Sequence, residues 1–133
     1  MSRRSARKNA FFLLFQMDFN QAEEYEQVKE IFFAEAEEPV EEEDKQFIIS
    51  EVEGTRSHLE EIDYIIGECA KGWNTDRMSK VDLAILRLAV YELRFGEDTP
   101  VGVAINEAVE LAKKFSSDEA PGFINGILGK VVQ

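Results

Sequence analysis

The sequence predicts an all-α bundle of about seven helices. Apolar residues recur at helical spacing along most of the chain, and no stretch alternates apolar and polar residues for long enough to suggest a strand. The segment KVDLAILRLAVYELRF, residues 80–95, is apolar at nearly every angle around its axis, which is typical of a helix in the middle of a bundle. A length of 133 residues with only 3 prolines suits one compact helical domain.

Two helices are expected in the first 38 residues. The first helix starts at an N-cap of Ser2 or Ser5 and ends near Phe19. The residues that it turns inward are Ala6, Ala10, Leu13 and Met17. The second helix covers 22–38 and ends at Pro39, because proline lacks the N–H that a continuing helix needs.

Two more helices are expected before residue 73. One covers about 43–56. The other starts where Ser57 and Glu60 have the spacing of a capping box, and it runs to about Gly72. Its apolar stripe includes Cys69, which we interpret as a buried core thiol.

Three helices complete the chain. The helix over 80–95 stops at Gly96, and Thr99 with Pro100 provides the N-cap and first-turn proline of the next helix. A last short helix is driven by apolar residues, namely Phe123, Ile124, Ile127, Leu128 and Val131. Arg87 lies within the apolar helix over 80–95, so a carboxylate such as Glu92 or Glu107 should pair with it.

The composition argues against several kinds of site. One cysteine and one histidine cannot supply a zinc site, and the sequence has no Gly-rich phosphate loop. No nucleophile, base and orienting residue stand together, so we expect no catalysis and no cofactor or metal. A single cysteine fits a reducing compartment, and no run of 18 apolar residues is long enough to span a membrane. We therefore expect a cytoplasmic protein.

The net charge of -12 is unevenly distributed. Residues 1–17 carry four cations and no acid, whereas residues 18–53 carry fourteen acids against two lysines. We interpret the acidic segment as a solvated face. Because physiological salt screens charges beyond about 8 Å, the basic N-terminus can act locally if the acids lie elsewhere on the surface.

Cations and aromatic rings share one face of the first expected helix. The members of this face are Arg3, Arg4, Arg7, Lys8, Phe11 and Phe15. The inward stripe points elsewhere, so we expect the basic face to stay in water. Such a surface suits single-stranded nucleic acid, whose phosphates meet the cations while a ring stacks on a base. The alternative is a solvated first turn followed by core phenylalanines.

Four segments resemble the NusB family of transcription antitermination factors. They are RRSARKNAFFLLFQMD (3–18), DLAILRLAVYEL (82–93), TPVGVAINEAVELAKKFS (99–116) and FINGILGKV (123–131). The resemblance covers essentially the whole chain. It implies an all-α fold of two helical subdomains, at about 1–75 and 76–133, and no catalysis. The same module resembles the N-terminal part of a family of RNA cytosine methyltransferases, but we expect no such activity because 133 residues leave no room for a cofactor-binding domain.

The resemblance also implies a function. NusB-like proteins bind the boxA element of nascent ribosomal RNA transcripts, together with the small-subunit ribosomal protein that acts as NusE, and help RNA polymerase to resist termination. By position, the resemblance assigns RNA contacts to Arg3, Arg4, Arg7, Lys8, Phe15, Glu119 and Phe123. It assigns contact with the ribosomal protein to Asp82 and its helix, including Leu83.

Three positions depart from the family pattern. Gly102 stands where relatives often have a basic residue, and Leu83 stands where they often have arginine, so both reduce positive charge. Phe15 replaces a tyrosine and has lost a hydroxyl donor, although its ring can still stack. Leu83 extends an apolar surface, so the alternative function is a protein-only helical scaffold or a homodimer that covers the RNA site.

Overall fold

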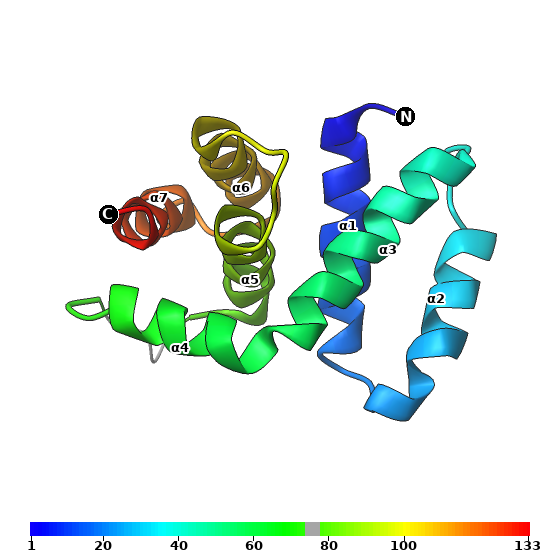
Figure 1. Cartoon of the computed structure of the whole chain (residues 1–133), viewed down its shortest axis with the longest axis horizontal. Helices are drawn as coiled ribbons and strands as arrows, with labels where there is room; N and C mark the ends of the chain where they lie inside the picture. The colour runs from blue at the N-terminus through cyan, green and yellow to red at the C-terminus, as the bar shows by residue number, and fades with distance from the viewer. Residues whose placement is uncertain (74–77) are drawn as a thin grey trace. The chain divides into compact units, whose positions relative to one another are not determined.

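The computed structural model describes residues 1–73 and 78–133, and these residues form seven α-helices, one 3₁₀-helix and no strand (Figure 1). The predicted all-α fold is confirmed. The elements are α1 (Arg3–Met17), η1 (Ala22–Glu24), α2 (Tyr25–Ala34), α3 (Glu42–Ser57), α4 (Leu59–Cys69), α5 (Lys80–Arg94), α6 (Val101–Phe115) and α7 (Ala120–Val131).

Contacts within the chain divide it into two compact units. Unit 1 is residues 1–53 and unit 2 is residues 54–133, so the division falls inside α3. The boundary expected near residue 75 differs from this division, and residue 75 itself lies outside the described residues. The difference arises because α4 packs against α5 and α7, which makes it part of unit 2.

Unit 1 is built around the predicted stripe of α1. Ser2 is the N-cap, since its Oγ accepts a hydrogen bond from the Ser5 N–H at 3.0 Å. All four residues expected to face inward are buried, namely Ala6, Ala10, Leu13 and Met17. On the neighbouring helix, α2, the hydroxyl of Tyr25 donates a hydrogen bond to Glu53 Oε2 at 2.7 Å.

The helix α2 is shorter than expected. It ends at Ala34 instead of residue 38, and residues 35–41 form a connection to α3. Glu35, Glu37 and Glu38 follow the end of α2, where negative charge opposes the helix macrodipole. This unfavourable charge, and the restriction that Pro39 places on the residue before it, both disfavour a helix that continues to residue 38.

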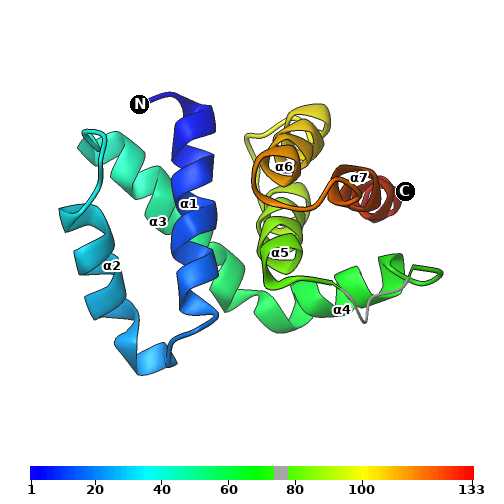
Figure 2. The same ribbon diagram turned by 180° about the vertical axis from the view of Figure 1, so that it is seen from behind.

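Unit 2 is a bundle with α5 at its centre. Figures 1 and 2 show α4, α6 and α7 around α5, and α5 contacts all three. Six apolar residues of α5 are buried, namely Ala84, Ile85, Leu86, Leu88, Ala89 and Val90. The prediction that residues 80–95 form a central helix is confirmed. None of the described helices is both long and apolar enough to cross a membrane.

Two expected helix caps in unit 2 are wrong. Ser57 Oγ donates back to the carbonyl of Gly54 at 3.1 Å, and His58 is the N-cap of α4. Thr99 Oγ1 donates to Glu92 Oε1 at 3.1 Å, so Pro100 stands at the N-cap of α6 without a side-chain cap. In both places the hydroxyl binds a nearby acceptor in place of the helix N-terminus.

The expectation that a carboxylate pairs with Arg87 is confirmed. Its guanidinium donates to both carboxylate oxygens of Asp63, at 2.8 and 2.9 Å, and so joins α5 to α4. The partner is thus Asp63, which was not among the two examples, Glu92 and Glu107, named from the sequence. Cys69, expected in the core, is only half-buried.

Candidate nucleic-acid interface

The cations of α1 differ in exposure. Arg3 and Arg4 are exposed and Lys8 is half-buried, but Arg7 is only 6% exposed. The expectation that the whole basic face stays in water is therefore wrong for Arg7. Arg7 lies one turn after Arg3, on the side of α1 that meets α3, and its Cζ is 5.7 Å from the centroid of the Phe47 ring.

Arg3 is positioned by an aromatic ring. Its Cζ lies 4.0 Å from the centroid of Phe47, which α3 presents to the first turn of α1. A guanidinium within about 6 Å of a ring centroid is attracted by the electron-rich face of the ring. Arg3 is therefore oriented and yet remains exposed, which suits a contact with a phosphate.

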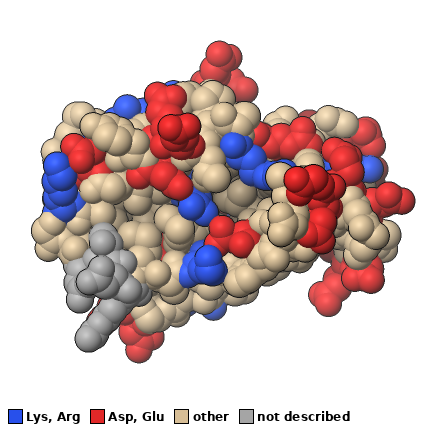
Figure 3. Space-filling view, turned by 90° about the horizontal axis from the view of Figure 1, so that it is seen from below, with Lys and Arg blue, Asp and Glu red and all other residues tan. Residues whose placement is uncertain are grey.

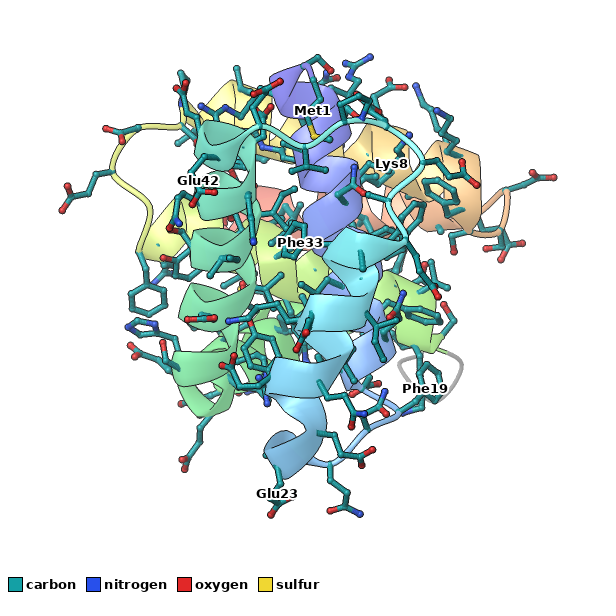
Figure 4. All side chains as sticks on the ribbon, turned by 90° about the vertical axis from the view of Figure 1, so that its right-hand side faces the viewer. Met1, Lys8, Phe19, Glu23, Phe33 and Glu42 are labelled. Atoms are coloured by element: carbon teal, nitrogen blue, oxygen red, sulfur yellow. The ribbon has the colours of Figure 1, made fainter. Side chains whose placement is uncertain are left out.

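Carboxylates of unit 1 surround the same end of α1. Ser5 Oγ donates to Glu38 Oε2 at 3.0 Å, and the Met1 ammonium pairs with Asp44 at 3.2 Å. Lys8 lines a pocket with Glu35, Glu37 and Glu38 of the connection between α2 and α3; Figure 4 shows Lys8 beside that connection. Figure 3, which views the molecule from below and not from the N-terminal end of α1, shows that acidic side chains also gather elsewhere over unit 1, at the right of the view. Any nucleic acid on α1 must compete with these carboxylates.

Lys29 of α2 forms ion pairs with two acidic residues of unit 1, Glu26 and Glu53. Its pKa is raised above the ordinary 10.5 by a hydrogen bond to Glu26 and by the charges of Glu26 and Glu53, despite an opposing effect of burial. The ammonium lies 3.0 Å from Glu26 Oε2 and 3.5 Å from Glu53 Oε2. Lys29 therefore belongs to the acidic surface of α2 and adds nothing to the basic face.

The aromatic row of α1 extends further than expected. Phe11 is only 2% exposed and belongs to the core, so its predicted place on the open face is wrong. Phe15 is half-buried between Phe11 and Phe19, with ring centroids 6.2 and 5.1 Å away. Phe19 is 61% exposed. Sequence reasoning treated Phe19 only as a helix end, although its spacing of four residues from Phe15 was a usable signal.

Unit 2 brings three predicted residues to one pocket. The pocket has a volume of about 320 Å³, and its lining residues are Trp73, Met78, Asp82, Ser117, Glu119, Ala120 and Phe123. The resemblance assigned Glu119 and Phe123 to RNA and Asp82 to a protein partner. The structure places all three side by side within unit 2.

Asp82 is held in place by its neighbours. It is only 7% exposed, and its Oδ1 accepts a hydrogen bond from Ser116 Oγ at 2.5 Å. It also stands in the first turn of α5, where a carboxylate is favoured by the helix macrodipole. Leu83 is half-buried and lines a separate groove between α4 and α5, beside Arg87.

Trp73 is the residue of this pocket that sequence reasoning missed. Its ring meets Phe123 edge-on, with centroids 5.1 Å apart and an interplanar angle of 74°. A Cβ added to Gly126 would lie 2.8 Å from Trp73 Cζ2, so only glycine lets the indole lie this close to α7. The signal available in the sequence was a lone tryptophan directly after a glycine. In the structure, Gly72 has a φ of 92°, which marks a turn.

Comparison with known proteins identifies the family. A sequence model of the NusB family matches residues 4–133. The chain belongs to the NusB family. The transcription antitermination protein NusB of Natranaerobius thermophilus is 50% identical over 131 residues, which cover 98% of this chain and 94% of that protein. The NusB of Agathobacter rectalis is 45% identical over 130 residues and 98% of each chain.

Solved NusB structures share the fold. NusB of T. maritima superposes with a TM-score of 0.87 at 35% identity, over 99% of this chain and 91% of that one. A crystal structure of the antitermination factors NusB and NusE in complex with dsRNA gives a TM-score of 0.77 at 29% identity, over 98% and 95%. NusB proteins are transcription antitermination factors and not enzymes, which confirms the prediction of a non-catalytic protein.

Proposed function

We propose that this chain binds the boxA element of nascent ribosomal RNA, together with the small-subunit ribosomal protein that acts as NusE. The observation that carries the proposal is the exposed pair Arg3 and Arg4 in the first turn of a helix held by its Ser2 cap. The solved relative that contains NusB, NusE and dsRNA supports both partners. In this role the chain acts in the cytoplasm as an adaptor for the antitermination complex of RNA polymerase.

The electrostatic part of this binding is modest. With Arg7 buried, the cations of α1 that are exposed or half-buried are Arg3, Arg4 and Lys8. Three phosphate contacts on a single strand give a slope of log affinity against log salt of about -2.1. A slope this small, in a chain with a net charge of -12, means that base contacts or the protein partner must supply the remaining affinity.

A titration of boxA RNA tests the proposal. We expect the labelled strand to bind, and to bind more tightly when the ribosomal protein is added. The variant Arg3→Glu/Arg4→Glu should lose most of the affinity for RNA. The control Arg56→Glu/Lys113→Glu makes the same change in net charge on unit 2, at residues that do not line the described pockets of that unit, and should retain it. Equal losses in the two variants would remove α1 from the mechanism.

The rival function is a protein-only scaffold or homodimer. It is favoured by the apolar Leu83, beside the groove between α4 and α5. Sedimentation at several concentrations distinguishes the two functions. A tight dimer that fails to bind boxA RNA would support the rival, whereas a monomer that binds RNA supports the adaptor.

A further inference from the structure

We propose that a groove between α1 and α2 of unit 1 docks a basic amphipathic helix of a second protein partner. This acidic groove has a volume of about 340 Å³, and its described lining residues all belong to unit 1. The residues that the resemblance assigns to the ribosomal protein, Asp82 and Leu83, belong to unit 2. The inference therefore goes beyond the proposed function.

The lining of the acidic groove is partly apolar. Phe12 of α1 and Phe32 of α2 are half-buried, and Ile31 of α2 is 49% exposed. The lining residues Lys8, Phe12 and Gln16 follow one another at intervals of four, so the groove runs along one face of α1. Such a groove suits an amphipathic helix, which places apolar residues at i, i+3 or i+4, and i+7 into it.

Carboxylates border the acidic groove at one end. The connection between α2 and α3 contributes three exposed acids to the lining, namely Glu35, Glu37 and Glu38. Figure 4 shows this connection beside Lys8, the one lysine among the described lining residues. The Met1 ammonium also lines the groove, and it already pairs with Asp44. The carboxylates therefore leave negative charge that attracts cations of a partner.

This charge also distinguishes between possible occupants. The surrounding segment, residues 22–44, carries eleven acids and one lysine, which repels the phosphates of RNA. A second copy of the chain, with a net charge of -12, is disfavoured in the same way. A basic protein helix is attracted by the carboxylates and can bury Ile31, so the charge and the apolar side chains favour the same occupant.

Three synthetic peptides of about 15 residues test the docking, because shorter isolated helices are marginal in water. The first peptide places leucines along one helical face and lysines at one end. The second has glutamate in place of each lysine, and the third has the first composition in scrambled order. We expect the first peptide, labelled for anisotropy, to bind the full-length chain. The other two should bind about tenfold more weakly or less, because they lack the charge or the apolar face.

A substitution in the apolar part of the groove locates the peptide. Ile31→Ser should weaken binding of the first peptide about fivefold, because about half of an isoleucine side chain is no longer buried on docking. Val101→Ser is the matched control and should retain the affinity, since Val101 is also 49% exposed but lies in α6 and does not line the groove. Circular dichroism of each variant checks the fold.

Substitutions of the acids test the charge. Glu35→Gln/Glu37→Gln should weaken binding of the first peptide about 2- to 30-fold at low salt, the range for two ion pairs near a surface. Glu23→Gln/Glu30→Gln removes two exposed charges of unit 1 that do not line the groove, and it should retain most of the affinity. Equal losses would reflect general attraction to an acidic protein and would overturn the groove as the site.

Other occupants give different results. The proposal is overturned if the first peptide fails to bind, or if it binds Ile31→Ser as tightly as the unchanged chain. It is also overturned if the ribosomal protein displaces the peptide, because the groove then belongs to that partner. If Ile31→Ser weakens RNA binding, or dissociates a dimer detected by sedimentation, the occupant is RNA or a second copy and the proposal fails.

Discussion

The exposed face of α1 in unit 1 and the pocket of unit 2 offer different chemistry to a ligand. The first turns of α1 present Arg3 and Arg4, with Phe47 beneath the guanidinium of Arg3. The pocket presents two rings and two carboxylates, and no cation among its described lining residues. Under the proposed function, attraction to the phosphate backbone and contacts with bases would be carried by separate residues.

This separation suits a chain with a net charge of -12. A broad basic surface would bind any RNA, whereas a few cations supply limited attraction without sequence preference. Selectivity then depends on contacts with bases. Measurements of salt dependence and of base identity should therefore respond to different substitutions.

The largest expected effect separates salt dependence from base contacts. Loss of two phosphate contacts in Arg3→Gln/Arg4→Gln should flatten the salt slope by about 1.4, which lowers affinity for single-stranded RNA about 60-fold at roughly 50 mM salt and about tenfold at 200 mM. Glu119→Gln should leave the slope unchanged. Titrations at four salt concentrations measure both slopes, and a change of slope in Glu119→Gln would break the comparison.

A smaller effect, on the fold, comes from two glycines of α7. Gly129 has open space around it, so Gly129→Ala should stabilise the protein by about 0.5–1 kcal/mol through helix propensity. Gly126→Ala should lose that gain, because the new Cβ displaces the indole of Trp73. Urea unfolding measures the stability, and the emission spectrum of Trp73 should shift only in Gly126→Ala. Equal stabilisation without a spectral shift would show that the indole does not depend on Gly126.

The smallest expected effect concerns the acids beside α1. Glu37→Gln/Glu38→Gln removes two charges near Lys8 and should raise RNA affinity about two- to fivefold at low salt, consistent with roughly 1 kcal/mol for a close pair of charges in water. The control Glu23→Gln/Glu30→Gln removes two exposed charges that do not line that pocket. If both variants gain equally, net charge alone is responsible and the local competition is absent.

Much of the fold could be predicted from the sequence because burial follows helical spacing. The stripe of α1 and the central position of α5 are both direct consequences of where apolar residues recur. The wrong predictions of helix caps concern side chains that can bind either of two partners. Thr99 binds Glu92 in place of the helix N-terminus, and that choice depends on a contact seven residues away.

The candidate site was less predictable for the same reason. Arg7 belongs to the basic arc by spacing, but the approach of Phe47 from α3 decides its burial. The contact between Trp73 and Phe123 joins residues fifty positions apart, which no local pattern reveals. The family resemblance named Glu119, Phe123 and Asp82 from their positions in the chain, and the structure added that they share a pocket.

The close approach of the indole to α7 also constrains how this protein can evolve. A lineage that acquires any side chain at position 126 loses the room that the indole occupies, so it must also give up or reorient the tryptophan. The two positions are therefore coupled, and any side chain at 126 requires the indole at 73 to move or to be replaced.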